Sequence, residues 1–298
     1  MKEGWGARYT DDMKRHLMLS LIAFALPITV FGASITIRPT EPIQGDPLMI
    51  QIDGLSSTTT VQSISLAGRA LNSFIYERKP TAFYGIDLRK TPGIYHITAR
   101  LSDGTILIRD VVIGSKEKYE AVFTIPAKLG GNATSSQKAL ASRLAQENAS
   151  LENIWSGRKA FWTLPFRYPT AIPIVTDTYG YVRKTGVTTI AHKGADFRAV
   201  TGTPVMAMNR GVVRMVRGFQ DYGRTIVVDH GLGLMTFYMH LSKIFVNEGE
   251  LALPGQVIGQ SGDTGYAESP HLHITVRIGG ISIDPVRFME LFERPLVE

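Results

Sequence analysis

Short runs of β-branched and aromatic residues, separated by turn residues, recur along most of this 298-residue chain. Between residues 34 and 126, examples are 35–37, 48–52, 94–101 and 106–113. Asp53-Gly54 and Asp103-Gly104 follow such runs, and Asp-Gly pairs favour the tight turns of hairpins. The spacing of these turns is typical of two packed sheets. We therefore predict an immunoglobulin-like β-sandwich over residues 34–126.

Residues 127–177 have a different pattern. Gly130-Gly131-Asn132 opens a polar stretch, and residues 135–155 then contain many helix formers. The apolar residues that return to one face of a helix in this segment are Leu140, Leu144, Leu151 and Trp155. We predict a single amphipathic helix, with an interruption of its apolar stripe at Glu147-Asn148. The Trp, Phe, Tyr and Pro residues that follow predict an irregular linker segment packed along the next domain.

Beyond residue 178 the pattern of short strands returns. Runs at 211–216, 225–228, 234–238 and 272–278 are strand-like, and no long helical period appears before the last few residues. Gly279-Gly280 separates two such runs, as in a hairpin. The sequence predicts a mainly β protein whose last domain, residues 178–290, is mostly antiparallel.

The N-terminus carries a nearly continuous apolar run, Leu17 to Phe31, directly after Lys14-Arg15-His16. This arrangement is typical of a signal peptide, and the run is shorter than the roughly 20 residues that a membrane span needs. We predict a signal peptide over residues 1–33, with an uncleaved N-terminal membrane anchor as the alternative. Asp11 and Asp12 do not suit a signal peptide, so we expect translation to start at Met13. Export would place the protein in the periplasm or cell envelope.

Charge and cysteine content limit the partners and the metal ligands. The formal net charge of +6 favours an anionic partner, but the basic residues are scattered without interleaved aromatic residues, so we expect no nucleic-acid binding. The chain has no cysteine. Any metal must therefore be held by His, Asp or Glu.

Five of the seven histidines lie between residues 192 and 273. His192 and Asp196 are four residues apart, whereas His271 and His273 are two apart and share one face of a strand. Catalytic zinc typically takes three protein ligands and leaves a fourth position for water. His192, Asp196 and one of the last two histidines would make this set. The spacing leaves open which of the two it is.

Several motifs in this region together resemble the lysostaphin-type, or LytM-like, metallopeptidases of family M23. They are His192-Lys-Gly-Ala-Asp196, Val228-Asp-His-Gly-Leu-Gly233, Tyr238-Met-His240-Leu-Ser242, His271-Leu-His273 and Asp284-Pro285. The resemblance implies a two-sheet β core with an open cleft. It implies that His192, Asp196 and His273 bind Zn²⁺, and that His240 and His271 are catalytic histidines that do not bind the metal.

The function implied by this resemblance is a zinc-dependent endopeptidase acting on peptidoglycan. It would hydrolyse peptide cross-links or stem peptides of the bacterial wall, with His240 and His271 transferring protons and stabilising the oxyanion. The first alternative is a non-catalytic LytM-like protein that binds the wall or activates an amidase. The second is a structural envelope protein that binds glycan without zinc. The sequence indicates neither the bond that is cut nor the oligomeric state.

Other histidines and the glycines have simpler interpretations. His230 lies in a family-like signature but not at a site position, so we expect a structural role for it. His96 lies within a predicted strand and is expected to be packed or hydrogen-bonded. Four glycines, at positions 194, 202, 233 and 265, are expected to serve turns that need a positive φ.

Overall fold

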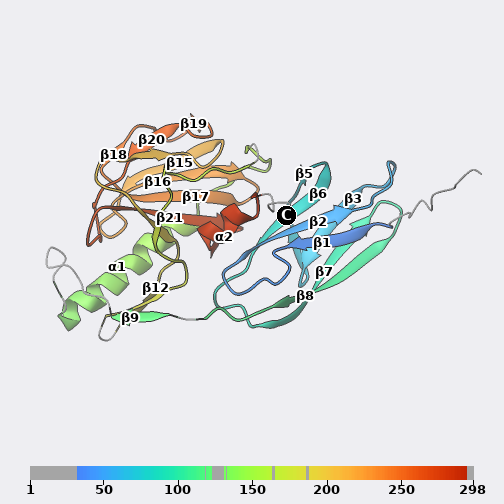
Figure 1. The fold of residues 1–298 in the computed structure, drawn as a ribbon, viewed down its shortest axis with the longest axis horizontal. Coiled ribbons are helices and arrows are strands. Elements are labelled where there is room, and N and C mark those ends of the chain that lie inside the picture. The colour runs from blue at the N-terminus through green and yellow to red at the C-terminus, as the bar shows by residue number, and fades with distance from the viewer. Residues whose placement is uncertain are drawn as a thin grey trace, which may run out of the picture. The chain divides into compact units, whose positions relative to one another are not determined.

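The computed structural model describes residues 32–117, 119–122, 131, 133–162, 165–185 and 188–293 (Figure 1). Residues 1–31 of the predicted signal peptide or anchor (residues 1–33), with the expected start at Met13, lie outside these ranges, as do residues 123–130 and 132. Within them, strands dominate, which confirms the mainly β fold. Neither helix in the described ranges has the length and apolar character to cross a membrane.

Two four-stranded antiparallel sheets form the first part of the structure. One has the order β1 (Ser34–Arg38), β2 (Pro47–Asp53), β6 (Lys79–Gly85) and β5 (Ser73–Tyr76). The other has the order β4 (Arg69–Leu71), β3 (Val61–Leu66), β7 (Gly93–Leu101) and β8 (Ile106–Ile113). Alternate side chains of β2 and β7, such as Ile50 and Ile97, fill one core between the sheets. The sheets form a sandwich, and its immunoglobulin-like character stays a prediction.

The central strands β2 and β6 of the first sheet are buried on both faces. Leu48 and Ile50 face the sandwich core, whereas Met49 between them belongs to a second core together with Phe83. The ring centroid of Phe83 lies 6.1 Å from that of Phe288 and 6.1 Å from that of Phe292. The sandwich and the C-terminal part therefore share a hydrophobic core.

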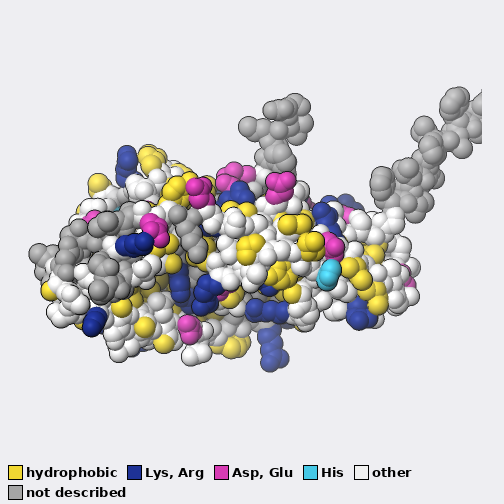
Figure 2. Space-filling model, turned by 90° about the horizontal axis from the view of Figure 1, so that it is seen from below, with side chains coloured by type: hydrophobic (Ala, Val, Ile, Leu, Met, Phe, Trp, Pro, Cys, Tyr) yellow, Lys and Arg dark blue, Asp and Glu magenta, His cyan; other side chains and the backbone are white. Residues whose placement is uncertain are grey.

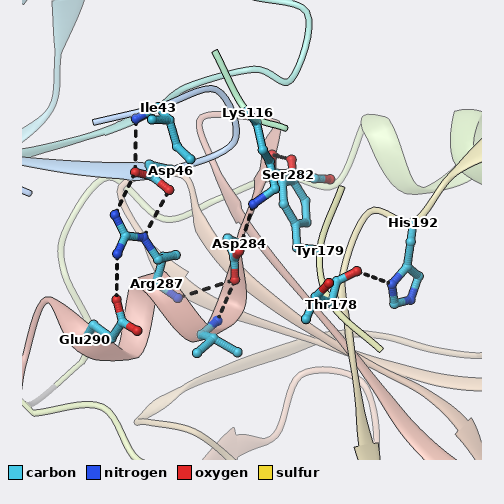
Figure 3. Close-up of polar contacts among 11 residues, drawn as sticks. Ile43, Asp46, Lys116, Thr178, Tyr179, His192, Ser282, Asp284, Arg287 and Glu290 are labelled. Atoms are coloured by element: carbon cyan, nitrogen blue, oxygen red, sulfur yellow. Dashed lines mark hydrogen bonds and ion pairs between the residues drawn. The ribbon is translucent and has the colours of Figure 1, made fainter. Parts of the chain in front are cut away.

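Polar contacts support the same junction (Figure 3). Arg287 donates from Nε and Nη2 to the buried carboxylate of Asp46, at 3.3 and 3.2 Å. Asp284 accepts the backbone N–H groups of Val286 and Arg287 at the start of α2 (Pro285–Glu290), and Lys116 Nζ lies 3.5 Å from its Oδ2. Burial raises the pKa of Asp284. Contacts join residues 33–298 into one compact unit, so the predicted domain boundaries stay predictions.

The C-terminal part contains two antiparallel sheets, as the family resemblance implied. The larger runs in the order β10 (Val175–Asp177), β13 (Ala195–Arg198), β21 (His271–Ile278), β17 (Leu234–Leu241), β16 (Arg224–Gly231), β15 (Gly211–Gly218) and β19 (Leu251–Ala252), and β22 (Ile281–Ile283) pairs with β21. The smaller has the order β14 (Pro204–Met206), β20 (Val257–Gln260) and β18 (Lys243–Ile244). Alternate residues of β21 enter the core between them, because Leu272, Ile274 and Val276 are buried there.

The predicted helix is present as α1 (Thr134–Glu152), but it ends before Trp155, which was predicted on its apolar face and is 63% exposed. The segment before it contributes β9 (Glu120–Val122), which pairs in parallel with β11 (Val182–Thr185), and β11 pairs with β12 (Thr188–Ala191). In Figure 1, α1 and this three-stranded sheet lie beside the large sheet. On the face shown in Figure 2, lysine and arginine side chains lie singly or in small groups among polar and apolar side chains.

Candidate metal centre

Two neighbouring strands and the turn before them bring the predicted metal ligands together. Asp196 on β13 is directly opposite His273 on β21, and His192 lies between β12 and β13. One ligand atom from each of the three residues lies within 4.8 Å of the others, and all three residues are buried. The structure thus places the three predicted ligands in one cluster.

Gly194 makes room for this cluster. A Cβ atom at Gly194 would lie 2.4 Å from Nε2 of His273 and 2.3 Å from the carbonyl oxygen of Ile274. The predicted positive φ at Gly194 is wrong, because the position needs space rather than a left-handed backbone. The same prediction is confirmed at Gly202, Gly233 and Gly265.

The distances within the cluster suit a small metal ion. Oδ1 of Asp196 lies 3.1 Å from Nε2 of His192 and 2.8 Å from Nδ1 of His273, and these two nitrogen atoms are 3.0 Å apart. Tetrahedral zinc with bonds of about 2.0–2.1 Å holds its ligand atoms about 3.3 Å apart. The three atoms therefore have nearly the spacing that such an ion requires.

Hydrogen bonds on the far side of each ring orient the two histidines. His192 Nδ1 donates to the carbonyl oxygen of Thr178 at 2.9 Å (Figure 3). His273 Nε2 donates at 3.0 Å to Oγ1 of Thr275, whose hydroxyl donates to the carbonyl oxygen of Lys193 at 3.1 Å. Each ring then keeps a lone pair on the nitrogen that faces Asp196. Two lone pairs and a carboxylate oxygen in contact need a cation between them, so these residues fit a metal ion.

The protonation states support this arrangement. Burial works to raise the pKa of Asp196, but its contacts with His192 and His273 outweigh burial and hold this pKa well below its ordinary value. Burial lowers the pKa of His273 to about 4. At neutral pH, Asp196 is therefore ionised and His273 is neutral. Metal ligands need these two states.

A β-bulge turns His240 into the same site. Between the pairs Ile226–Tyr238 and Arg224–Leu241, two residues of β17 stand opposite one of β16. Tyr238 and Leu241 therefore both enter the core between the two sheets, although regular alternation would put them on opposite faces. His240 has a φ of 60°, in the left-handed region that a histidine rarely adopts. Its ring centroid lies 6.0 Å from that of His273.

His271 completes the predicted pair of catalytic histidines. Its ring centroid is 4.8 Å from that of His240, and its Nε2 lies 3.7 Å from Oδ1 of Asp196. His240 Nδ1 donates to the carbonyl oxygen of Thr264 at 2.9 Å, and His271 Nδ1 donates to that of Ser269 at 2.8 Å. The Nε2 atom of each ring takes no part in these bonds. Burial lowers the pKa of His240 to about 3, so this ring is neutral.

Helix α1 supports the backbone that holds His240. The sequence did not lead us to predict this support. The Glu147 carboxylate accepts the backbone N–H groups of Gln220, Asp221 and Tyr222, at 2.8, 3.0 and 3.0 Å. The carbonyl oxygen of Tyr222 in turn accepts the backbone N–H of His240 at 3.0 Å. The interruption of the apolar stripe at Glu147 was the available signal, because a buried carboxylate needs donors.

Two cavities adjoin the cluster. One, of about 320 Å³, is lined by His192, His240 and His273 and by residues of α1 and β12. The other, of about 360 Å³, is lined by Asp196 and His271. Tyr266 lines both. The site thus lies between two spaces that can take the two sides of an extended substrate.

The other predicted histidines lie outside this cluster. His230 is fully buried, where its Nδ1 donates to the carbonyl oxygen of Arg210 at 2.8 Å and its Nε2 contacts Thr236 Oγ1 at 2.9 Å. Burial lowers its pKa to about 4. His96 is exposed, and its Nδ1 lies 2.6 Å from Oδ1 of Asp110 on the paired strand. Both fit the structural roles expected of them.

A ligand set of this kind, with two further histidines beside it, is typical of metallopeptidases, which are hydrolases. Residues 190–285 match the family model "Peptidase family M23". Residues 190–285 of this chain therefore resemble the peptidase domain of family M23.

Similar proteins agree with this assignment. Peptidoglycan DD-endopeptidase ShyA of Vibrio cholerae is 42% identical over 96 residues, which are 32% of this chain and 22% of that protein. DD-carboxypeptidase/endopeptidase Mpg of Neisseria meningitidis serogroup B is 40% identical over 95 residues, 32% of this chain and 22% of Mpg. The match thus spans about a fifth of each relative.

A solved structure extends the likeness beyond the peptidase domain. A crystal structure assigned to peptidase M23 from Pseudomonas aeruginosa is 25% identical and has a TM-score of 0.59. The alignment covers 84% of this chain and 95% of that one. Because residues 190–285 alone are a smaller share of the chain, the likeness includes strands before the matched domain.

Proposed function

We propose that this chain is a zinc-dependent endopeptidase that hydrolyses peptide cross-links or stem peptides of bacterial peptidoglycan. The observation that carries the proposal is the buried cluster of His192, Asp196 and His273, with His240 and His271 beside it. The printed names of ShyA and Mpg support the wall as the substrate. Action on the wall requires export, so we place the protein in the periplasm or cell envelope.

Zinc is the metal that the ligand chemistry favours. Two imidazole nitrogens and one carboxylate oxygen are a common catalytic zinc set, and three protein ligands leave a position for water. When bound, the metal would lower the pKa of its water and polarise the scissile carbonyl group. His192, Asp196 and His273 would hold it.

The two other histidines would move protons. Nδ1 of each donates to a backbone carbonyl group, so Nε2 of His240 and of His271 is free to accept a proton from the attacking water. A ring protonated in this way can then donate from Nε2 to the departing amine. Asp196 stays ionised, because its contacts with the two ligand histidines hold its pKa well below the ordinary value.

The non-catalytic alternatives make a different prediction for the same five residues. A wall-binding or amidase-activating protein has no need of a lone pair at Nε2 of His240 or of the strained backbone that places it there. The presence of all five residues in one cluster favours the enzyme.

The test is digestion of purified peptidoglycan by the zinc-loaded protein, followed by mass spectrometry of the released fragments. We expect cleavage products with new peptide termini and about one zinc per chain. His240→Ala is the matched control, since it keeps the metal ligands. Intact wall after incubation with well-folded, zinc-loaded protein would contradict the proposal and favour a non-catalytic role.

A further inference from the structure

Arg277 on β21 is a buried cation without a carboxylate partner in the described part of the chain. The residue is only 7% exposed. Nε donates to Oγ of Ser282 at 3.3 Å, and Nη1 donates to the carbonyl oxygen of Leu151 at 2.8 Å. The guanidinium carbon lies 4.6 Å from the ring centroid of Phe237. A buried charge without a counter-ion is costly, so such a group gains from binding an anion.

The cavity that Arg277 lines is the one of about 320 Å³ that opens onto His240 and His273. Its charged lining residues are Arg277, Lys193 and Asp221. Asp221 is already paired, because Nη2 of Arg143 lies 3.2 Å from its Oδ1. The cavity therefore has an excess of positive charge.

The rest of the lining strengthens the attraction for an anion. Ala141, Leu144 and Ala145 of α1 form an apolar wall, and Ile190, Ala191 and Met239 add apolar surface. A charge acts more strongly beside such low-dielectric walls than in open water. Glu152, at the end of α1, is exposed and forms no ion pair with Arg277 among the described residues, although its charge acts on Arg277 from a distance.

We propose that this cavity is a subsite for a free carboxylate group of an acidic peptide substrate, bound by Arg277 with Lys193 as the second cation. The planar guanidinium group suits a carboxylate, and its Nη2 has two N–H groups that no acceptor in the described residues takes up. The subsite rests on the proposed function, because it determines which peptides the proposed endopeptidase accepts.

The spacing of residues along β21 gives an approximate distance between Arg277 and the bond that is cut. His273 and Arg277 lie on the same face of β21, four residues apart, which corresponds to about 13 Å at 3.3 Å per residue. An extended peptide covers this distance in about four residues. We therefore expect the carboxylate group a few residues from the scissile bond.

The experiment compares two peptides with the zinc-loaded full chain. One is a cross-linked stem-peptide fragment of peptidoglycan, and the other is the same fragment with its free carboxylate groups converted to amides. We expect kcat/KM to be about 10-fold higher or more for the acidic fragment, the usual scale for a charge-assisted contact. In Arg277→Met this ratio should fall to about one, and in Lys193→Met it should fall part of the way. Arg100→Met, which removes an exposed charge from the sandwich, should leave the ratio unchanged.

Equal kcat/KM values for the two fragments in the wild type would overturn the subsite, and so would an unchanged ratio in folded Arg277→Met. If Arg277→Met does not fold, Lys193→Met decides, and an unchanged ratio there overturns the proposal. If the wild type cleaves neither fragment, the proposed function has failed. Calorimetric titration of the protein with the same two fragments then tests the subsite independently of hydrolysis. Binding of the acidic fragment that is at least 10-fold tighter supports the subsite, and equal or absent binding overturns it.

Discussion

Asp196 and His273 stand directly opposite each other on β13 and β21, with Oδ1 of Asp196 2.8 Å from Nδ1 of His273. Register alone creates this contact, because directly opposed residues of antiparallel strands point to the same face. The turn before β13 brings His192 next to these two residues. The metal centre is therefore fixed mainly by the pairing of two strands.

Thr275 orients His273, so its hydroxyl group should matter for metal affinity. In Thr275→Val, Nε2 of His273 loses its acceptor and the ring loses its fixed tautomer. We expect zinc affinity to fall about 10-fold to 100-fold, the usual effect of removing such a partner. Thr275→Ser keeps the hydroxyl group and is the control. Competition with a chromogenic chelator measures the affinity, and an unchanged affinity in Thr275→Val would remove Thr275 from this role.

Glu147 should stabilise the fold through the loop that it binds. Glu147→Ala leaves three backbone N–H groups without their acceptor, which should lower the free energy of unfolding by about 1–3 kcal/mol. Glu152→Ala removes an exposed carboxylate from the same helix and should change it by less than about 0.5 kcal/mol. Urea denaturation of both variants checks this. Equal small effects would show that water replaces Glu147 without loss.

His230 should make stability depend on pH. Burial lowers its folded-state pKa to about 4, whereas the unfolded chain binds a proton near the ordinary value of 6.5. Stability from this group is complete above pH 6.5 and is lost as pH falls toward 4, by about 3 kcal/mol. His230→Gln should show a smaller loss between these values, measured by urea denaturation at several pH values. Parallel pH profiles in the two proteins would contradict the assignment.

Phe83 should couple the sandwich to the C-terminal part. Phe83→Ala removes a ring that packs against Phe288 and Phe292, and we expect a loss of about 3–5 kcal/mol. Because these rings belong to one shared core, unfolding should stay a single transition in the wild type, monitored by calorimetry. Exposed Phe245 offers a control, since Phe245→Ala should have little effect. Two separate transitions in the wild type would show that the halves unfold independently.

The sequence predicted the parts of this structure that depend on local pattern. Strand runs, the helix and the pairing of His271 with His273 follow from periodicity and spacing, and the choice of His273 as the ligand came from family resemblance. The position of His240 could not be derived from periodicity, because a bulge with a left-handed residue reverses the alternation of β17. The burial of the second face of β2 could not be predicted either, since Met49 belongs to a core whose aromatic residues include several more than 100 positions away. Contacts that depend on tertiary packing leave no local signal.

The most direct test of the account is zinc content and peptidoglycan hydrolysis measured together in three variants. His273→Ala should lose both zinc and activity, because only two protein ligands remain. His271→Ala and His240→Ala should each keep about one zinc per chain and lose about 10²-fold or more in hydrolysis, the scale of general acid–base catalysis. Loss of zinc from His271→Ala with retention in His273→Ala would reverse the two assignments, and near-normal hydrolysis by His240→Ala would contradict the proposed mechanism.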